Sequence, residues 1–235
     1  MSHLKRLSAP RSWQIERKVK KWAVRPSPGP HGLEESIPLL NVIRDYLLLT
    51  DNAREAKKLI SGRKIFVDGK ARTDYRFPCG LMDVITILPL NESYRVLIDS
   101  RGMLRLVKIE EEMAKWKLCR IENKTTIRGG KTQLNLHDGR NIIVNEDKYK
   151  TGDTLKISIP KQEIIEHIPL QEGYLGLITG GSHKGKIGKI KRVIVTKSPL
   201  PNIVELDGFS TIKDYVFPVG KDESLIKLPE VSIYG

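Results

Sequence analysis

The sequence has little cysteine, a shortage of acid and no long apolar run, and each shortage excludes a class of protein. Its two cysteines, Cys79 and Cys119, are too few for a disulfide framework or a four-cysteine metal site. We expect both to be reduced thiols of a cytosolic protein. No apolar stretch approaches the roughly 20 residues of a membrane-spanning helix, and no signal-peptide core follows the N-terminus.

The charge is the outlier of the composition. Forty-one Lys and Arg stand against 28 Asp and Glu, which gives a formal net charge of +13 over 235 residues. Hydrophobic residues make up 39%, near the globular average, so the chain can bury a real core. The basic excess favours a polyanionic partner, because released counterions drive association with nucleic acid.

The first 32 residues form a basic arm that contains two tryptophans and ends in "RPSPGPHG". Its prolines fix φ and remove donors, so this stretch is predicted to be extended. We expect the arm to be disordered alone and to order on RNA, where tryptophans stack or enter grooves. Deleting residues 1–32 should then leave the other domains folded. The proposed RNA contacts are Lys5, Arg6, Arg11, Trp13, Arg17, Lys18, Lys20, Lys21, Trp22 and Arg25.

Two helices are predicted between residues 36 and 62. Pro38 suits a first helical turn, and an apolar stripe at helical spacing follows it. The second helix begins at Asn52 with Glu55 three residues on, which is a capping-box arrangement, and Gly62 lies just past its end. The two apolar faces are Leu39, Val42, Ile43, Tyr46 and Leu47, and then Ala53, Ala56, Leu59 and Ile60.

A hairpin is predicted next, because Asp68-Gly69 in "RKIFVDGKAR" supplies a tight turn. Beyond about Tyr94 the chain is predicted to be mostly strand, with the same device at Asp138-Gly139 and Asp207-Gly208. Only residues 110–118 suggest another short helix. These turns between apolar runs indicate antiparallel β modules and argue against a parallel α/β sheet.

The stretch "GGSHKGKIGKIKRV" places Gly180, Gly185 and Lys186 at the spacing of a nucleotide-binding loop. That loop needs Ser or Thr after its lysine and a helix directly behind it. Ile187 stands there instead, and the β-branched residues that follow favour a strand. We therefore reject an NTPase.

Residues 173–195 instead resemble the KOW motif of small SH3-like barrels that bind RNA. In that resemblance Gly180, Gly185 and Gly188 lie where the backbone must turn sharply. No acid occurs from residue 183 to residue 204, so the run is strongly cationic. The proposed phosphate contacts are Lys184, Lys186, Lys189, Lys191 and Arg192.

The whole chain resembles the archaeal and eukaryotic S-four-e family of small-subunit ribosomal proteins. The arm "HLKRLSAPRSW", the "RPSPGPH" segment, the "REAKKLISGRKIFVDGKARTDYRFPCGLMDVI" stretch and the KOW loop occur in the order typical of that family. The resemblance implies an α+β multidomain fold. Its parts are a basic extended N-terminal arm (1–41), an S-four-type helix–helix–hairpin RNA-binding domain (42–92), a central, mostly antiparallel β domain (93–170), an SH3-like KOW barrel (171–213) and a C-terminal segment (214–235).

The resemblance also implies a structural constituent of the small ribosomal subunit that binds rRNA and supports assembly and translation. It implies no enzymatic activity, no cofactor, a cytoplasmic location, and rRNA and neighbouring ribosomal proteins as partners, with no membrane and no small-molecule substrate. In S-four-type domains the second helix and the following turn meet RNA. The matching positions are Arg54, Lys57, Lys58, Arg63 and Lys64, followed by Lys70 and Arg72 of the hairpin.

Two alternatives stay open: a KOW-bearing regulator that visits nucleic acid, and an RNA-modifying enzyme with an S-four-type domain. Such an enzyme needs a catalytic aspartate in a large dedicated domain, and only the central segment is left for one. Asp138 and Asp207 are better explained as turn residues. No metal site is predicted, because the five histidines lack metal-ligand spacing. They are His3, His31, His137, His167 and His183.

Overall fold

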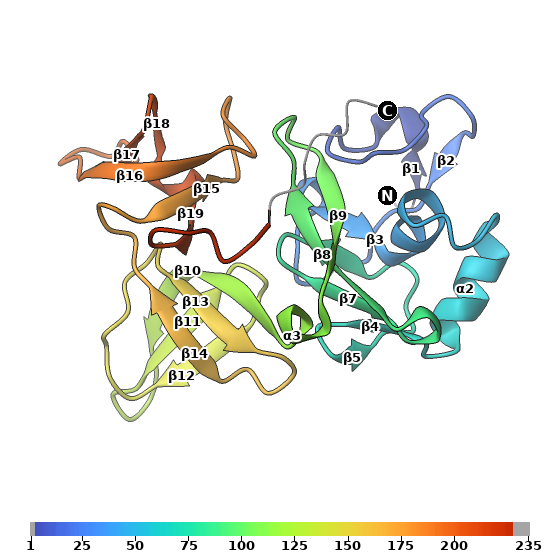
Figure 1. The fold of residues 1–235 in the computed structure, drawn as a ribbon, viewed down its shortest axis with the longest axis horizontal. Coiled ribbons are helices and arrows are strands. Elements are labelled where there is room, and N and C mark those ends of the chain that lie inside the picture. The colour runs from blue at the N-terminus through green and yellow to red at the C-terminus, as the bar shows by residue number, and fades with distance from the viewer. Residues whose placement is uncertain (1–2, 228–235) are drawn as a thin grey trace. The chain divides into compact units, whose positions relative to one another are not determined.

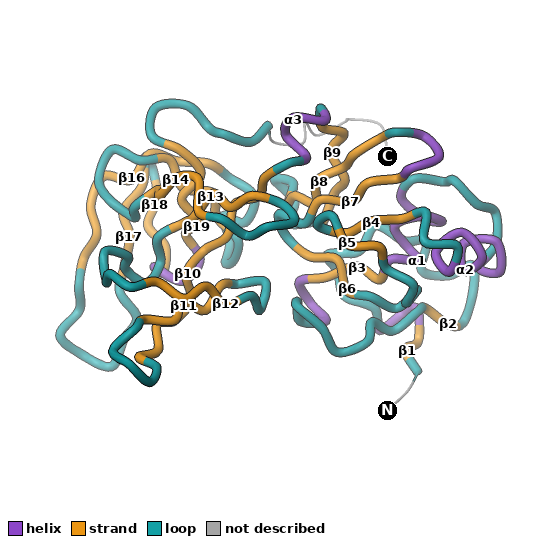
Figure 2. The backbone as a smooth tube through the Cα atoms, turned by 90° about the horizontal axis from the view of Figure 1, so that it is seen from below, coloured by secondary structure: helices purple, strands orange, loops and turns teal. Residues whose placement is uncertain are grey.

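The computed structural model describes residues 3–227, and residues 228–235 of the predicted C-terminal segment lie outside this range. The described chain divides into two compact units (Figure 1). The first contains residues up to Leu97 together with Met103–Lys117, and the second contains Ile98–Gly102 and the chain from Leu118 onward. Strands and loops make up most of both units (Figure 2). Among the described residues no helix is long and apolar enough to cross a membrane.

A five-stranded antiparallel sheet of order β5-β4-β7-β8-β9 forms the centre of the first unit. Two short strand pairs, β1-β2 and β3-β6, accompany it. The strands are β1 (Leu4–Lys5), β2 (Trp22–Ala23), β3 (Ser36–Pro38), β4 (Ile65–Val67), β5 (Lys70–Ala71), β6 (Pro78–Gly80), β7 (Val84–Ile87), β8 (Glu92–Ile98) and β9 (Leu104–Ile109). Strand β9 thus pairs with this sheet, although the sequence analysis started a central domain at residue 93.

The helices of the first unit are short. They are α1 (Leu39–Asn41), α2 (Ala53–Ser61) and α3 (Glu111–Ala114), with 3-10 turns at Arg6–Ser8, Leu33–Glu35 and Leu88–Leu90. The first predicted helix is irregular, because α1 continues into a π-helical turn, Val42–Tyr46. Its predicted apolar stripe is nevertheless the core side, since Leu39, Val42 and Ile43 are fully buried. The short helix expected within 110–118 is α3, after which the chain enters a strand at Trp116.

Two five-stranded antiparallel sheets make up the second unit, with orders β12-β11-β10-β13-β14 and β18-β17-β16-β15-β19. Each has its own apolar cluster, one around Cys119, Leu134 and Leu155 and one around Ile178, Ile190 and Val204. The strands are β10 (Trp116–Thr126), β11 (Thr132–Leu136), β12 (Asn141–Val144), β13 (Thr154–Ser158), β14 (Ile164–Ile168), β15 (Leu175–Ile178), β16 (Ile187–Ile194), β17 (Ile203–Leu206), β18 (Phe209–Ile212) and β19 (Val216–Gly220), with a 3-10 turn at Lys213–Tyr215.

The three Asp-Gly turns lie where the sequence places them, and they join β4 to β5, β11 to β12 and β17 to β18. Their glycines have φ of 71° (Gly69), 73° (Gly139) and 87° (Gly208), a region that favours glycine. The prediction of antiparallel β modules is therefore confirmed. Strand β19 pairs with β15, so the last sheet extends past residue 213 and includes part of the segment 214–235.

Candidate nucleic-acid interface

The second helix presents a basic face to solvent because its ends and its apolar side are fixed. The Asn52 side chain accepts hydrogen bonds from the backbone N–H groups of Arg54 (3.0 Å) and Glu55 (3.1 Å), which caps the helix as predicted. Ala56 and Ile60 are fully buried on the opposite side. The cations on the outer face are all exposed, and they are Arg54, Lys57 and Lys58.

The turn after α2 extends this basic face. Gly62 is the residue just past the helix, but its φ is −70°, and Arg63 takes the left-handed conformation with φ of 55°. Gly62 therefore does not serve as the left-handed cap that its position suggested. Arg63 and Lys64 are exposed, and so is Lys70 in the hairpin. Arg72 differs, because its half-buried guanidinium lies 4.2 Å from the centre of the Phe77 ring.

A buried ionic network holds the base of the same hairpin. The Lys117 ammonium lies 2.8 Å from Asp68 and 2.9 Å from Asp83, and Asp83 also contacts His31 at 3.0 Å. Asp68 further accepts a hydrogen bond from the backbone N–H of Val84 (2.9 Å). It is thus both a turn residue and an anchor for the turn that carries Lys70. Sequence analysis could not detect this network, because its contacting pairs are 34 to 52 residues apart.

The electrostatics of this network follow from its burial. Burial alone would raise the pKa of Asp83, but the His31 ring and the Lys117 ammonium outweigh it and hold that pKa well below its usual range. Burial raises the pKa of the neighbouring Cys79 thiol, and the charges of Asp83 and Asp68 add to the effect. Cys79 is therefore a protonated thiol rather than a nucleophile.

The N-terminal arm is folded onto the first unit, which corrects the expectation of disorder. Trp13 is only 2% exposed, and its indole N–H donates to the carbonyl of Ser36 at 2.6 Å. Arg6 is also buried, and Arg17 donates to the carbonyls of Ala9 and Pro10. Trp13 and Arg6, both expected to contact RNA, are therefore buried side chains of the first unit. Burying a large aromatic ring stabilises the folded state more than leaving it exposed to water does.

Other arm residues do face solvent. Trp22 is 49% exposed on the β1-β2 pair, and the Lys21 ammonium lies 5.1 Å from the centre of its ring. Arg25 is half-buried, and its carbonyl accepts a hydrogen bond from Arg76. The stretch 24–31 contains no helix or strand, as its prolines predicted. The exposed cations of the arm are Lys5, Arg11, Lys18, Lys20 and Lys21.

In the second unit, β16 forms a further basic surface, in addition to those on α2 and on the arm. The strand that was predicted in place of an NTPase helix runs from Ile187 to Ile194. Its side chains alternate, with Lys189 and Lys191 exposed on either side of the buried Ile190. The register shifts between Ile190 and Arg192, so that Arg192 is exposed beside Lys191. The bulge leaves two adjacent cations, Lys191 and Arg192, exposed to solvent.

The loop before β16 and the start of the strand contain the three glycines predicted at sharp turns, but only Gly185 among them has a positive φ. Gly185 has φ of +83°, and a Cβ there would lie 1.8 Å from the carbonyl oxygen of Asp99. Gly180 and Gly188 do not have positive φ. The chain bends at Gly180, as expected, but Gly188 lies within β16, which corrects the expectation of a sharp turn there. A Cβ at Gly180 would lie 2.5 Å from the Tyr215 ring, and Gly188 lies within β16 against Leu206. Close packing requires glycine at these two positions. Lys186 of this loop is exposed and Lys184 is half-buried.

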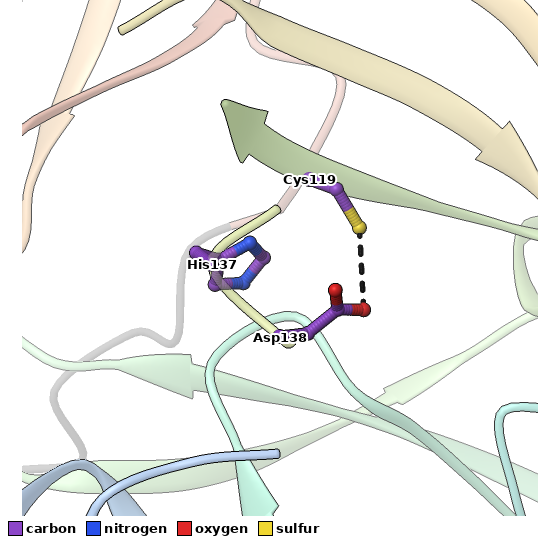
Figure 3. Close-up of side chains that lie close together, drawn as sticks. All are labelled: Cys119, His137 and Asp138. Atoms are coloured by element: carbon purple, nitrogen blue, oxygen red, sulfur yellow. Dashed lines mark hydrogen bonds between the residues drawn. The ribbon is translucent and has the colours of Figure 1, made fainter. Parts of the chain in front are cut away.

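The described residues of the second unit also bring three metal-ligand types together: Cys119, His137 and Asp138 (Figure 3). The Cys119 thiol donates to Asp138 over 3.5 Å, and the Arg140 guanidinium lies 3.1 Å from the same carboxylate. The backbone N–H of Arg120 donates to Nδ1 of His137 at 3.2 Å. These bonds account for the cluster without a metal ion, because each potential ligand already has a partner.

Comparison with known proteins identifies the family to which these modules belong. Three family models match: the RS4NT (NUC023) domain at residues 2–34, the S4 domain at residues 38–85, and the ribosomal family S4e at residues 90–164. A solved structure of the 30S ribosomal protein S4e from Thermoplasma acidophilum is 40% identical with a TM-score of 0.71. It covers 80% of this chain and 96% of its own.

Curated relatives extend the match to nearly full length. The small ribosomal subunit protein eS4 of Methanothermobacter thermautotrophicus is 53% identical over 97% of this chain and 96% of its own length. The protein of the same name from Methanocaldococcus jannaschii is 51% identical over 96% of this chain and 97% of its own length. Identity of this extent across all modules shows that the chain belongs to the S4e family of ribosomal proteins.

Proposed function

We propose that this protein is a structural constituent of the small ribosomal subunit that binds ribosomal RNA and supports subunit assembly. One observation carries the proposal: the chain is about half identical, over nearly its full length, to relatives named small ribosomal subunit protein eS4. The family is a ribosomal structural family and not an enzyme family. The modifying-enzyme alternative is therefore set aside.

The RNA contacts are proposed on three exposed basic surfaces. The first lies on the arm around Trp22, the second on α2 and the turns that follow it, and the third on β16 and its loop. Fixed cations on ordered elements suit phosphate contacts that set register, while unpaired bases and shape supply selectivity. Three separate surfaces support a contact at several points along folded RNA.

Finer features of the assignment are proposals as well. The glycine-punctuated loop and strand of β15-β16 support a KOW-type module, and the S4-type module spans about residues 42–92. The arm is proposed at residues 1–41. The bounds expected for the central β domain (93–170) and the C-terminal segment (214–235) shift, because β9 pairs with the sheet of the first unit and β19 pairs with β15. Neighbouring small-subunit proteins and rRNA are the proposed partners, and the cytoplasmic ribosome is the proposed location.

Sedimentation tests the function directly. A lysate of cells expressing the chain is washed at high salt and separated on a sucrose gradient, and the chain is quantified by mass spectrometry in each fraction. One copy per small subunit is the expected result. Recovery only in the soluble top fractions, while other small-subunit proteins stay in place, would contradict it and favour a regulator that binds RNA transiently.

A further inference from the structure

A recess in the first unit lies beside the basic surface of the arm, and the arm cations Arg11 and Lys20 line it and its neighbour. It has a volume of about 630 Å³ and lies between the arm and the segment that joins α1 to α2. A second recess of about 270 Å³ shares Arg6, Glu16, Asp45 and Leu48 with it, so the two are adjacent. The combined space lies within the range of about 300–1,000 Å³ typical of small-ligand sites.

The segment that borders the recess has two uncommon backbone features. The N–H of Leu47 donates to the carbonyl of Val42 at 3.0 Å, which closes the π-helical turn. Leu48 then has φ of 51°, a left-handed conformation that a leucine rarely takes. These two features direct Leu48 outward, where 78% of it is exposed. An apolar side chain therefore lines a recess instead of the core.

Unpaired polar groups surround this leucine. The side chains of Arg11 and Lys20 line the two recesses and make no hydrogen bond or ion pair with any described residue. Thr50 also lines the smaller recess, but its hydroxyl oxygen is buried away from solvent and has no partner among the described residues. The other cations are occupied, since Arg6 and Arg44 both pair with Asp45.

We propose that this recess binds one unpaired nucleotide of ribosomal RNA. The base packs on Leu48, and the flanking phosphates contact Arg11 and Lys20. The inference rests on the proposed binding of rRNA. RNA is the occupant because an apolar surface between two free cations matches a base between two phosphates, whereas an apolar protein side chain would leave both cations unpaired.

The test uses the full chain bound to transcribed small-subunit rRNA that contains 4-thiouridine. After near-ultraviolet irradiation, mass spectrometry locates nucleotide adducts on the peptides of the protein. Adducts on the peptides that contain Arg11 or Leu48 are expected. The variant Leu48→Gly should lose them and bind the RNA about tenfold more weakly, because the base no longer buries the apolar area of the leucine. Its thermal unfolding midpoint should not fall, since glycine suits a left-handed φ. The control Leu88→Gly removes another leucine, 54% exposed and outside the recess, and should bind like the wild type.

The outcomes separate this inference from the function on which it rests. Adducts confined to other peptides, together with wild-type affinity of Leu48→Gly, would overturn the nucleotide site while rRNA binding stands. A cross-link from this recess to a neighbouring protein in assembled subunits would overturn it too. Failure of the wild-type chain to bind the rRNA would overturn both proposals. If Leu48→Gly is unstable, the position of the wild-type adducts decides alone.

Discussion

The ammonium of Lys117 lies 2.8 Å from the carboxylate of Asp68, and both side chains are excluded from solvent. Through this contact the start of β10 fixes the turn of the β4-β5 hairpin, which lies 49 residues earlier. Lys117 also contacts Asp83, which holds His31 at the end of the arm. One buried lysine therefore links the arm, the basic hairpin and the following strand.

Replacing this lysine should destabilise the fold. Lys117→Met leaves two buried carboxylates without their cation, and breaking a buried pair in this way costs about 3–5 kcal/mol. Urea unfolding of the full chain measures the loss. Lys115→Met, at an exposed position two residues earlier, is the matched control and should change the free energy of unfolding little. Equal stability of the two variants would contradict a structural role of the network.

Acid should destabilise the protein through Asp83. Because the folded pKa of Asp83 lies below its unfolded value of about 3.9, its contribution is complete above that pH and is lost as pH falls towards the folded value. In Asp83→Asn the free energy of unfolding should therefore fall less steeply between pH 5 and pH 2. Denaturant titrations across this range test the slope. The control Glu110→Gln, at an exposed site, should keep the wild-type slope.

Substitution of each of the two arm tryptophans should have a different effect, one on the stability of the fold and the other on RNA binding. Trp13→Ala removes a buried indole and its hydrogen bond to Ser36, which should cost about 3–5 kcal/mol. Trp22→Ala should leave the unfolding midpoint nearly unchanged but weaken binding to rRNA, because half of that ring is exposed. Thermal unfolding and filter binding measure the two effects. Deletion of residues 1–32 should likewise destabilise the first unit, and a normal unfolding midpoint of that deletion would restore the free-arm interpretation.

Gly185→Ala should disrupt the loop before β16. Both Gly185 and Gly208 have positive φ, but a Cβ at Gly185 would meet the Asp99 carbonyl at 1.8 Å, whereas nothing lies within 4 Å at Gly208. Gly208→Ala should cost only the conformational strain, on the order of 1 kcal/mol, and Gly185→Ala should cost clearly more. Calorimetry of both variants compares the losses. A smaller loss at Gly185 would mean that the Asp99 contact is absent.

Charge removal on β16 should change the salt dependence of RNA binding. The triple variant Lys189→Ala, Lys191→Ala, Arg192→Ala removes three exposed cations and should keep the fold. Each lost phosphate contact lowers the slope of log affinity against log salt by about 0.7–0.9. Binding to rRNA at several salt concentrations measures the slope. Lys148→Ala, at an exposed position outside the three surfaces, should leave it unchanged, and an unchanged slope in the triple variant would remove β16 from the interface.

The sequence by itself determined the local features of this protein. Asn52 and Glu55 define a helix start because a cap acts on backbone atoms of adjacent residues. The Asp-Gly pairs define hairpins because glycine adopts a positive φ without strain. Ile187 after Lys186 excluded an NTPase in the same local way. The basic excess and the order of its motifs indicated an RNA-binding ribosomal family. The helix start, the hairpins and the rejected NTPase loop each depend on residues within a few positions of one another.

Tertiary structure alone decided which basic-arm residues face solvent and which lie in the core. Trp13 and Trp22 occur in similar basic surroundings, yet one is buried and the other half-exposed, because burial depends on what packs against each ring. The same holds for Asp68, a turn residue by sequence that also pairs with Lys117. Pairings of this kind join residues dozens of positions apart, and the free energy of burying a charge or a ring is set only when the folded chain brings its partner close.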